Sequence, residues 1–401
     1  MAENLKDTIK EKIDLLEFLS SKGITWTNQS SNPKALCVFH EEKTPSFTLS
    51  KDRKRYKCYG CNESGDVFDY LMSAEKLTFV EAIRQLSSYL SLEYDDNSFS
   101  DEVEKRKKIK IINNEVLDVN SLAQSYFSKQ LFDQNSENSK FVRSYLDDRG
   151  ISVEAARKNL LGYCPDGNMG SLMSFFQSNK TNKRGVINSN LLMRNDESGD
   201  WLDFFRNRLT IAILDENSNI VGFSGRALTD NSKSKYINSR ESEVFNKSSL
   251  LYGLDRASEA IRLKSQAVVV EGYFDCISGY ERGYNNLVAA MGTQISSDSF
   301  EKLKNLTTYD SDSGEIIFCF DNDNAGKKAA VDTIAKLKDM IASASKNNSK
   351  KLRIKVCFPS SGKDPDEIFR TNIVEWEEMI NLSQNFIDYL LDYYSVLHLQ
   401  G

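Results

Sequence analysis

The sequence lacks the features that would place it in a membrane or outside the cell. Its 401 residues contain no run of about eighteen apolar side chains, the length that a membrane-spanning helix requires. The first four residues read MAEN, and no apolar core of a signal peptide follows them. We therefore expect a cytoplasmic protein without a membrane partner.

Histidine is scarce, and cysteine occurs in an odd number. The chain has 2 histidines and 7 cysteines. Three of the cysteines and one histidine fall within residues 37–61. An odd and locally crowded set of cysteines suits metal ligands better than a framework of disulfides.

Length and charge limit the possible architectures. A chain of 401 residues is too long for one hydrophobic core, so we expect two or three domains. Its 40% hydrophobic and 27% charged residues are typical of ordinary globular proteins. The net charge of -6 does not exclude nucleic-acid binding, because acids that bind metal inflate the acidic count while basic residues cluster locally.

Three apolar runs in the second half of the chain are typical of buried parallel strands. They cover residues 266–270, 316–320 and 352–358, and acids follow each run. Open α/β sheets bind ligands at the edge where such strands end. Carboxylates gathered there repel one another unless cations lie between them, and an all-oxygen site suits Mg²⁺. The acids are Glu271, Asp275, Asp321, Asp323, Asp364 and Asp366. Any one of them could instead cap a helix, but the regular spacing of all three groups favours a metal site.

Two short motifs near the N-terminus have the spacing of a zinc site. They are CVFH at 37–40 and CYGC at 58–61. Two close pairs separated by a β-ribbon bring four ligands into a tetrahedron around one Zn²⁺. The predicted ligands are Cys37, His40, Cys58 and Cys61. Four protein ligands leave no position for water, so this zinc is expected to be structural. The alternative is a set of reduced cysteines that are paired by chance.

Basic residues gather in two places. Over residues 43–59, lysines and arginines alternate with aromatic residues, which suits phosphate contacts and stacking on single-stranded nucleic acid. The stretch 201–254 is rich in β-forming residues and carries a hairpin signal. Its cations lack neighbouring acids and are candidates for binding nucleotide and template: Arg206, Arg208, Arg226, Lys235 and Lys247. The alternative for both stretches is solvated surface charge.

These motifs together resemble the bacterial and phage DnaG-type primases. The zinc motifs and the intervening TPSF resemble the zinc-binding domain of that family. The segments FRNR, GFSGR, KYINS and FNK resemble the first part of its polymerase core. EGYFD, DNDNAG and KDPD resemble the TOPRIM module that primases share with topoisomerases. The resemblance places Lys235, Asn238 and Lys247 beside the metal site and adds Lys363 to the nucleotide-binding residues.

The expected architecture is multidomain, of α+β and α/β class. We expect a zinc ribbon domain at 1–95, a linker at 96–112, a mixed α/β N-terminal subdomain of the polymerase core at 113–258, a TOPRIM subdomain with a Rossmann-like parallel sheet at 259–370, and a C-terminal helical segment at 371–401. Within these domains, apolar periodicity predicts helices at 4–20, 66–74, 78–90, 114–132, 139–148 and 372–399.

The resemblance implies a DNA primase. Such an enzyme is a DNA-dependent RNA polymerase that makes short RNA primers on single-stranded DNA by metal-dependent nucleotidyl transfer. It implies one structural Zn²⁺ and at least two catalytic Mg²⁺ or Mn²⁺ ions. Asp321, Asp323 and Asp364, then Asp366, are the expected ligands; Glu271 is a ligand or takes the proton, and Asp275 supports it. The implied partners are template DNA, ribonucleoside triphosphates, the RNA primer and a replicative helicase, for a chain that is a monomer in isolation.

Two other functions stay open from the sequence alone. A TOPRIM nuclease or topoisomerase-like enzyme would need an ATPase or a further tyrosine-bearing domain, and the sequence has no GxxxxGK[ST] loop. A zinc-containing single-strand-binding protein without catalysis would not need the acids, and all of them are present. DnaG-type primases usually continue into a helicase-docking domain, and this sequence ends near where that domain would begin, as expected either of a shortened chain or of a short primase from a phage or mobile element.

Overall fold

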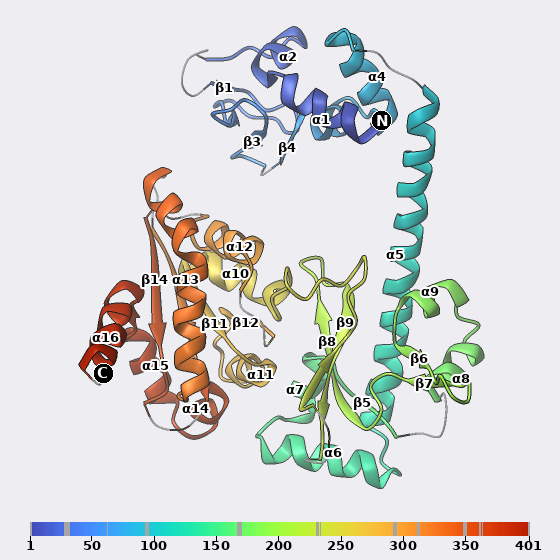
Figure 1. Cartoon of the computed structure of the whole chain (residues 1–401), viewed down its shortest axis with the longest axis vertical. Helices are drawn as coiled ribbons and strands as arrows, with labels where there is room; N and C mark the ends of the chain where they lie inside the picture. Colours follow the sequence, from blue (N-terminus) through green and yellow to red (C-terminus); the bar gives the residue numbers. More distant parts are fainter. Residues whose placement is uncertain are drawn as a thin grey trace. The chain divides into compact units, whose positions relative to one another are not determined.

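The computed structural model forms two compact units, Met1–Ile111 and Ile112–Gly401 (Figure 1). The described residues are 2–27, 33–61, 63–92, 96–166, 171–229, 232, 234–291, 295–309, 311, 313–347, 351–360, 362 and 364–399. Within them, no helix combines the length and the apolar character that crossing a bilayer requires.

The first unit is a small sheet packed against short helices. Its elements are α1 (Ala2–Lys12), α2 (Leu15–Ser21), β1 (Lys34–Ala35), β2 (Phe47–Leu49), β3 (Tyr56–Cys58), β4 (Ser64–Gly65), α3 (Val67–Ala74) and α4 (Phe79–Tyr89). The four strands form one sheet in sequence order. In its core the rings of Phe39 and Phe47 stack on Tyr56, and Tyr70 meets Tyr56 edge to face. The predicted helices at 66–74 and 78–90 are confirmed.

The single helix predicted at 4–20 is wrong, because the chain breaks between α1 and α2. Asp14 has extended backbone angles, and its Oδ1 accepts hydrogen bonds from the amides of Leu16 (2.8 Å) and Glu17 (3.2 Å). This N-cap starts a new helix. Apolar spacing continues through the break, so periodicity alone did not reveal it.

The residues predicted as a linker, 96–112, form the first part of a long helix, α5 (Asp96–Leu131). The boundary between the two units falls within this helix, at Ile111. The Glu- and Lys-rich stretch at 96–112 has no apolar face to mark it as helical, but these residue types form helices readily. The helix predicted at 114–132 is the second half of α5, and the one predicted at 139–148 corresponds to α6 (Glu137–Asp148).

The first half of the second unit is built on an antiparallel sheet. After α6 come α7 (Val153–Lys158), β5 (Leu161–Cys164), α8 (Ser171–Ser178), α9 (Lys183–Asn188), β6 (Leu192–Arg194), β7 (Trp201–Asp203), β8 (Arg208–Leu214), β9 (Ile220–Ala227) and β10 (Tyr236–Asn238). The sheet order is β10-β9-β8-β5, and β6 pairs with β7 separately. The predicted hairpin is confirmed, since β8 and β9 pair antiparallel from Arg208↔Ala227 to Leu214↔Ile220.

The second half is a parallel sheet between helices. Its elements are α10 (Leu254–Lys264), β11 (Gln266–Val270), α11 (Tyr273–Glu281), β12 (Leu287–Ala289), α12 (Ser297–Thr307), β13 (Ser313–Cys319), α13 (Asn324–Asn347), β14 (Lys351–Cys357), α14 (Pro365–Thr371), α15 (Ile373–Asn381), β15 (Gln384–Asn385) and α16 (Phe386–Leu399). The strand order is β12-β11-β13-β14-β15, and only β15 is antiparallel. The predicted parallel sheet is confirmed.

Alternate residues of the parallel strands pack on opposite faces. Val268 and Ile317 join a core with residues of α11, α14 and α15, whereas Val269 and Phe318 join a core with residues of α10, α12 and α13. Strands buried on both faces explain why the sequence shows continuous apolar runs. The helix predicted at 372–399 is interrupted, because β15 pairs with β14 between α15 and α16.

Candidate metal centres and active site

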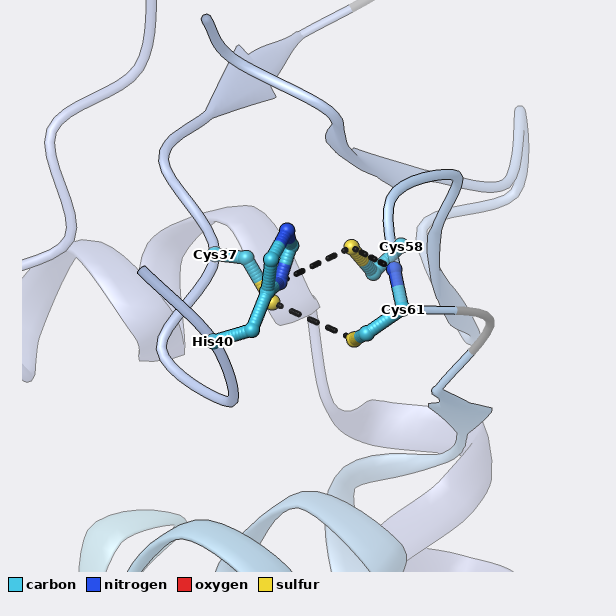
Figure 2. A group of neighbouring side chains, drawn as sticks. All are labelled: Cys37, His40, Cys58 and Cys61. Carbon is cyan, nitrogen blue, oxygen red and sulfur yellow. Dashed lines mark hydrogen bonds between the residues drawn. The ribbon is translucent and has the colours of Figure 1, made fainter. Parts of the chain in front are cut away.

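Four side chains from two loops of the first unit converge on one point (Figure 2). Cys37 and His40 follow β1, and Cys58 and Cys61 lie at and just after the end of β3. Their ligand atoms all lie within 4.8 Å of one another. The Cys37 Sγ to Cys61 Sγ and Cys58 Sγ to His40 Nδ1 distances are both 3.8 Å. Two ligand atoms of a tetrahedral site are separated by about this distance when each lies about 2.3 Å from the metal, the usual Zn–S bond length. The four residues therefore fit zinc.

The thiols require a cation to ionise together. Burial raises the pKa of Cys37 to about 12. Burial would also raise the pKa of Cys58, but hydrogen bonds from the Ser46 hydroxyl and from the amides of Cys61 and Gly60 lower it below its usual value. The site therefore favours the thiolate of Cys58 and disfavours that of Cys37. Both can be ionised at once only when a bound divalent cation neutralises their charges.

Glu42 supports both halves of this site. Its Oε1 accepts hydrogen bonds from the amides of Cys37 (2.8 Å) and Ser46 (3.1 Å), and its Oε2 accepts from Ser46 Oγ (2.5 Å). Ser46 Oγ in turn lies 3.2 Å from Cys58 Sγ. Glu42 Oε2 is 3.3 Å from His40 Nε2, which leaves Nδ1 of that ring to face the thiols. Nothing in the sequence marks Glu42 as a supporting residue, because a glutamate two positions after a ligand is not a distinctive pattern.

We expect Glu42→Gln to weaken zinc binding by about 10- to 100-fold, the usual effect of removing a carboxylate that orients a ligating histidine. The amide nitrogen of glutamine cannot accept from His40 Nε2 and Ser46 Oγ as the carboxylate does. Competition with a chromogenic chelator measures the affinity. Glu41→Gln, an exposed neighbour, is the matched control. Equal zinc affinity in both variants would show that these contacts do not support the site.

The predicted acids lie where the parallel strands end. Glu271 follows β11 directly, and Asp321 and Asp323 lie between β13 and α13. Asp364 caps α14, with its Oδ1 accepting from the Glu367 amide at 3.0 Å. Two of these acids are linked, because Glu271 Oε1 accepts from the Asp321 amide at 3.1 Å. Asp323 Oδ1 accepts from the Gly326 amide at 2.7 Å.

The charges of these acids act on one another. Burial, with the charge of Asp323 adding to it, raises the pKa of Glu271. Burial also raises the pKa of Asp275 well above its usual value, and the charges of Asp321, Asp364 and Asp366 raise it further. Such repulsion, in an all-oxygen donor set, fits hard divalent cations. In the part of the chain that the structure describes, however, only the Cys/His group brings three or more ligand atoms close enough for one ion. The carboxylates are gathered but not closed around a metal.

Asp275 and Asp366 differ from the other acids in their contacts. Asp275 is 6% exposed, and its oxygens accept from the amides of Gly272 (2.8 Å) and Asp366 (3.0 Å). Asp366 is 2% exposed and pairs with Arg149 and Arg370. Both acids therefore bind other groups of the protein through hydrogen bonds and ion pairs. Their role as metal ligands stays a prediction.

The predicted cations divide by their partners. Arg208 donates to the carbonyl oxygens of Gly225 and Ser234, and Arg206 donates to the carbonyl of Asp203. These two arginines secure the sheet. The Arg226 guanidinium donates to the Tyr236 hydroxyl and lies over three rings, at 5.2 to 5.3 Å from the centroids of Tyr145, Tyr236 and Phe274.

The remaining predicted residues lie around the same region. Asn238 Oδ1 accepts from the Tyr273 hydroxyl at 2.7 Å, which links β10 to α11 of the acidic half. Lys235 is exposed, and Lys247 is half-buried with its backbone amide bonded to Glu241. Lys363 lies outside the described residues.

Known families match the chain in three consecutive segments. A model of the CHC2 zinc finger matches residues 1–105, the N-terminal domain of the DNA primase catalytic core matches 126–258, and a Toprim domain matches 265–346. A solved DNA primase domain from Pseudomonas aeruginosa is 30% identical, with a TM-score of 0.60, over 71% of this chain and 84% of that one. The chain belongs to the DnaG-type DNA primases.

Two further DnaG-type primases match almost the whole chain. The DNA primase of Clostridium acetobutylicum is 33% identical over 393 residues, which is 98% of this chain and 61% of that protein. The solved zinc-binding and RNA polymerase domains of the Aquifex aeolicus primase are 27% identical, with a TM-score of 0.57, over 96% of this chain and 87% of that one. The chain thus spans about half to three fifths of the curated relatives that it matches.

Proposed function

We propose that this chain is a primase that synthesises short RNA primers on single-stranded DNA. One observation carries this proposal: an acidic edge of a parallel sheet, a cation-bearing antiparallel sheet and a Cys₃His cluster occur in one chain, in the order of the primase models that match it. An acidic edge alone would suit other phosphoryl-transfer enzymes, but the zinc ribbon and the matched catalytic core favour a primase.

At the acidic edge, Glu271, Asp321, Asp323 and Asp364 would hold the divalent metal. Mg²⁺ or Mn²⁺ bound there would lower the pKa of the primer 3′-hydroxyl and neutralise charge on the leaving pyrophosphate. The carboxylate of Glu271, whose pKa is raised by burial, would be a metal ligand or the group that takes the proton of that hydroxyl. Asp323 also begins α13 through its bond to Gly326, which fixes the carboxylate on a rigid element.

The cations on the antiparallel sheet would bind the triphosphate and the template backbone. The Arg226 guanidinium lies among three aromatic rings and donates to the Tyr236 hydroxyl, so its position is constrained before a ligand arrives. Lys235 directly precedes β10, Asn238 ends it, and Lys247 follows it in the chain. The RNA polymerase domain of the Mycobacterium tuberculosis primase DnaG, which is 26% identical, binds a double-stranded DNA oligomer with a 6-nucleotide overhang. By analogy with the overhang of that oligomer, we propose that this chain also binds a single-stranded template.

The zinc ribbon would select the initiation site on the template. Tyr59 is 67% exposed beside the cluster, and Lys57 Nζ lies 5.2 Å from its ring centroid, which suits stacking on a base beside a phosphate. The proposed reaction requires ribonucleoside triphosphates and yields an RNA primer. We also propose that the enzyme acts in the cytoplasm as a monomer and that a replicative helicase recruits it.

The test is primer synthesis on single-stranded DNA by the full chain, with labelled ribonucleotides and either Mg²⁺ or Mn²⁺. We expect short RNA products that require the template and the metal. Absence of products from zinc-loaded protein would overturn the proposal. Cleavage of the DNA template under the same conditions would favour a nuclease instead.

A further inference from the structure

Asp366 is the most enclosed of the predicted acids, and both of its oxygens are engaged. Oδ2 accepts from Arg149 Nη1 at 2.5 Å and lies 3.3 Å from Arg370 Nη2. Oδ1 accepts from Ser278 Oγ at 2.5 Å. A carboxylate that is 2% exposed and already paired with two guanidinium groups and a hydroxyl faces the protein interior rather than an ion at the sheet edge.

Arg149 reaches Asp366 from a distant part of the chain. It caps the C-terminal end of α6, and the two residues are 217 positions apart. Its guanidinium lies 5.2 Å from the ring centroid of Tyr145, on the same helix, and 4.9 Å from that of Phe274, on α11. The arginine is therefore held by stacking as well as by charge, and it joins α6 to the half that carries the acids.

The pair fixes the first turn of α14. The amide of Asp366 donates to Asp275 Oδ1 at 3.0 Å, and the other oxygen of Asp275 accepts from Gly272. The starts of α11 and α14 are thus tied through two buried carboxylates. Asp364 caps this same turn of α14, two residues before Asp366. Any shift of the turn would move Asp364 at the acidic edge.

We infer that Arg149 and Asp366 form a buried latch, and that Arg149 is a positioning residue for Asp364 in the reaction. Asp366 then serves the metal site through its hold on α14 and is not itself a metal ligand. Glu271, Asp321, Asp323 and Asp364 are left as the direct ligands. The part of this inference that concerns catalysis rests on the proposed primase function.

The two roles of Asp366 predict opposite behaviour when both partners are changed. Removing Arg149 alone leaves a buried carboxylate that has lost its closest cation and keeps only Arg370, 3.3 Å away, whereas removing both charges relieves that cost. If the two residues form a latch, the double variant should therefore be more active and more stable than Arg149→Met alone. If Asp366 were a metal ligand, its loss would lower activity in addition to the effect of losing Arg149. The double variant would then be no more active than either single variant.

The experiment compares Arg149→Met, Asp366→Asn and the double variant in the full chain. We expect Arg149→Met to lower the rate constant of primer extension by about tenfold or more with little change in KM for the nucleotide, and the double variant to recover about threefold of that loss. Binding of Mn²⁺ without nucleotide should weaken by less than about threefold in Asp366→Asn, against about tenfold or more in Asp364→Asn. A KM effect as the main result for Arg149→Met would instead mean direct nucleotide contact, and would overturn the latch.

Equal loss of Mn²⁺ affinity in Asp366→Asn and Asp364→Asn would also overturn the proposed latch, because it would show that both acids bind the metal. Lys140→Met is the matched control, since this cation lies on the same helix, α6, is 71% exposed and does not contact Asp366, and we expect it to behave as wild type. Thermal unfolding gives a readout that does not need catalysis: the midpoint should fall in Arg149→Met and partly recover in the double variant. If wild-type protein made no primers, the proposed function would fail, while Mn²⁺ binding and unfolding would still decide the latch.

Discussion

Asp321→Asn should reduce nucleotide incorporation by about 1,000-fold or more while the protein stays folded. Asp321 follows the central strand β13, and its amide is bonded to Glu271. Asparagine keeps the size of the side chain and its backbone contacts but removes a negative charge from the proposed metal site. The measurement is single-turnover extension of a supplied RNA primer at saturating Mn²⁺.

The same substitution should not lower stability in the absence of metal. The charge of Asp321 contributes to the raised pKa of Asp275, so neutralising Asp321 relieves repulsion at the acidic edge. We expect the unfolding midpoint in EDTA to equal or exceed that of wild type, and the stabilisation by added Mn²⁺ to shrink. Asp332→Asn, an exposed acid farther along α13, controls for charge loss and should keep wild-type activity. Near-normal extension by Asp321→Asn would remove this acid from the metal site.

The acidic edge was predictable because each step depends on local sequence. The runs at 266–270, 316–320 and 352–358 are apolar without alternation, since both faces of the sheet are covered. Parallel strands end at one edge, so the acids that follow them had to gather there. The Cys/His spacing at 37–61 similarly limits which four side chains can meet.

The errors came from features that a local pattern does not encode. The break between α1 and α2 depends on one side-chain cap at Asp14, which the apolar spacing does not mark. The pairing of β15 with β14 depends on tertiary contacts between segments that are separated in the sequence. Contacts between distant residues were equally out of reach: KDPD placed Asp366 just after Asp364 among the expected ligands, and its pairing with Arg149, 217 residues away, is visible only in the structure.

Loss of zinc should separate initiation from extension. Cys58 is fully buried at the end of β3, and its Sγ lies 3.8 Å from His40 Nδ1 in the proposed zinc site. Structural zinc contributes about 10–16 kcal/mol of apparent binding free energy in small zinc modules, so Cys58→Ala should unfold the ribbon of the first unit. The acids and cations of the proposed polymerase site all belong to the second compact unit, Ile112–Gly401, with a hydrophobic core of its own. Extension should therefore survive where initiation does not.

We expect Cys58→Ala to start primers at about 100-fold below the wild-type rate and to extend a supplied primer within about threefold of it. Zinc content should fall from one ion per chain to none. Val38→Ala changes an exposed side chain between the first two ligands and should keep both activities, and wild-type protein stripped of zinc should regain initiation when zinc is restored. If initiation and extension fell together, the zinc ribbon would be needed by the catalytic unit itself. The division of labour between template selection at the ribbon and chemistry at the acidic edge would then be wrong.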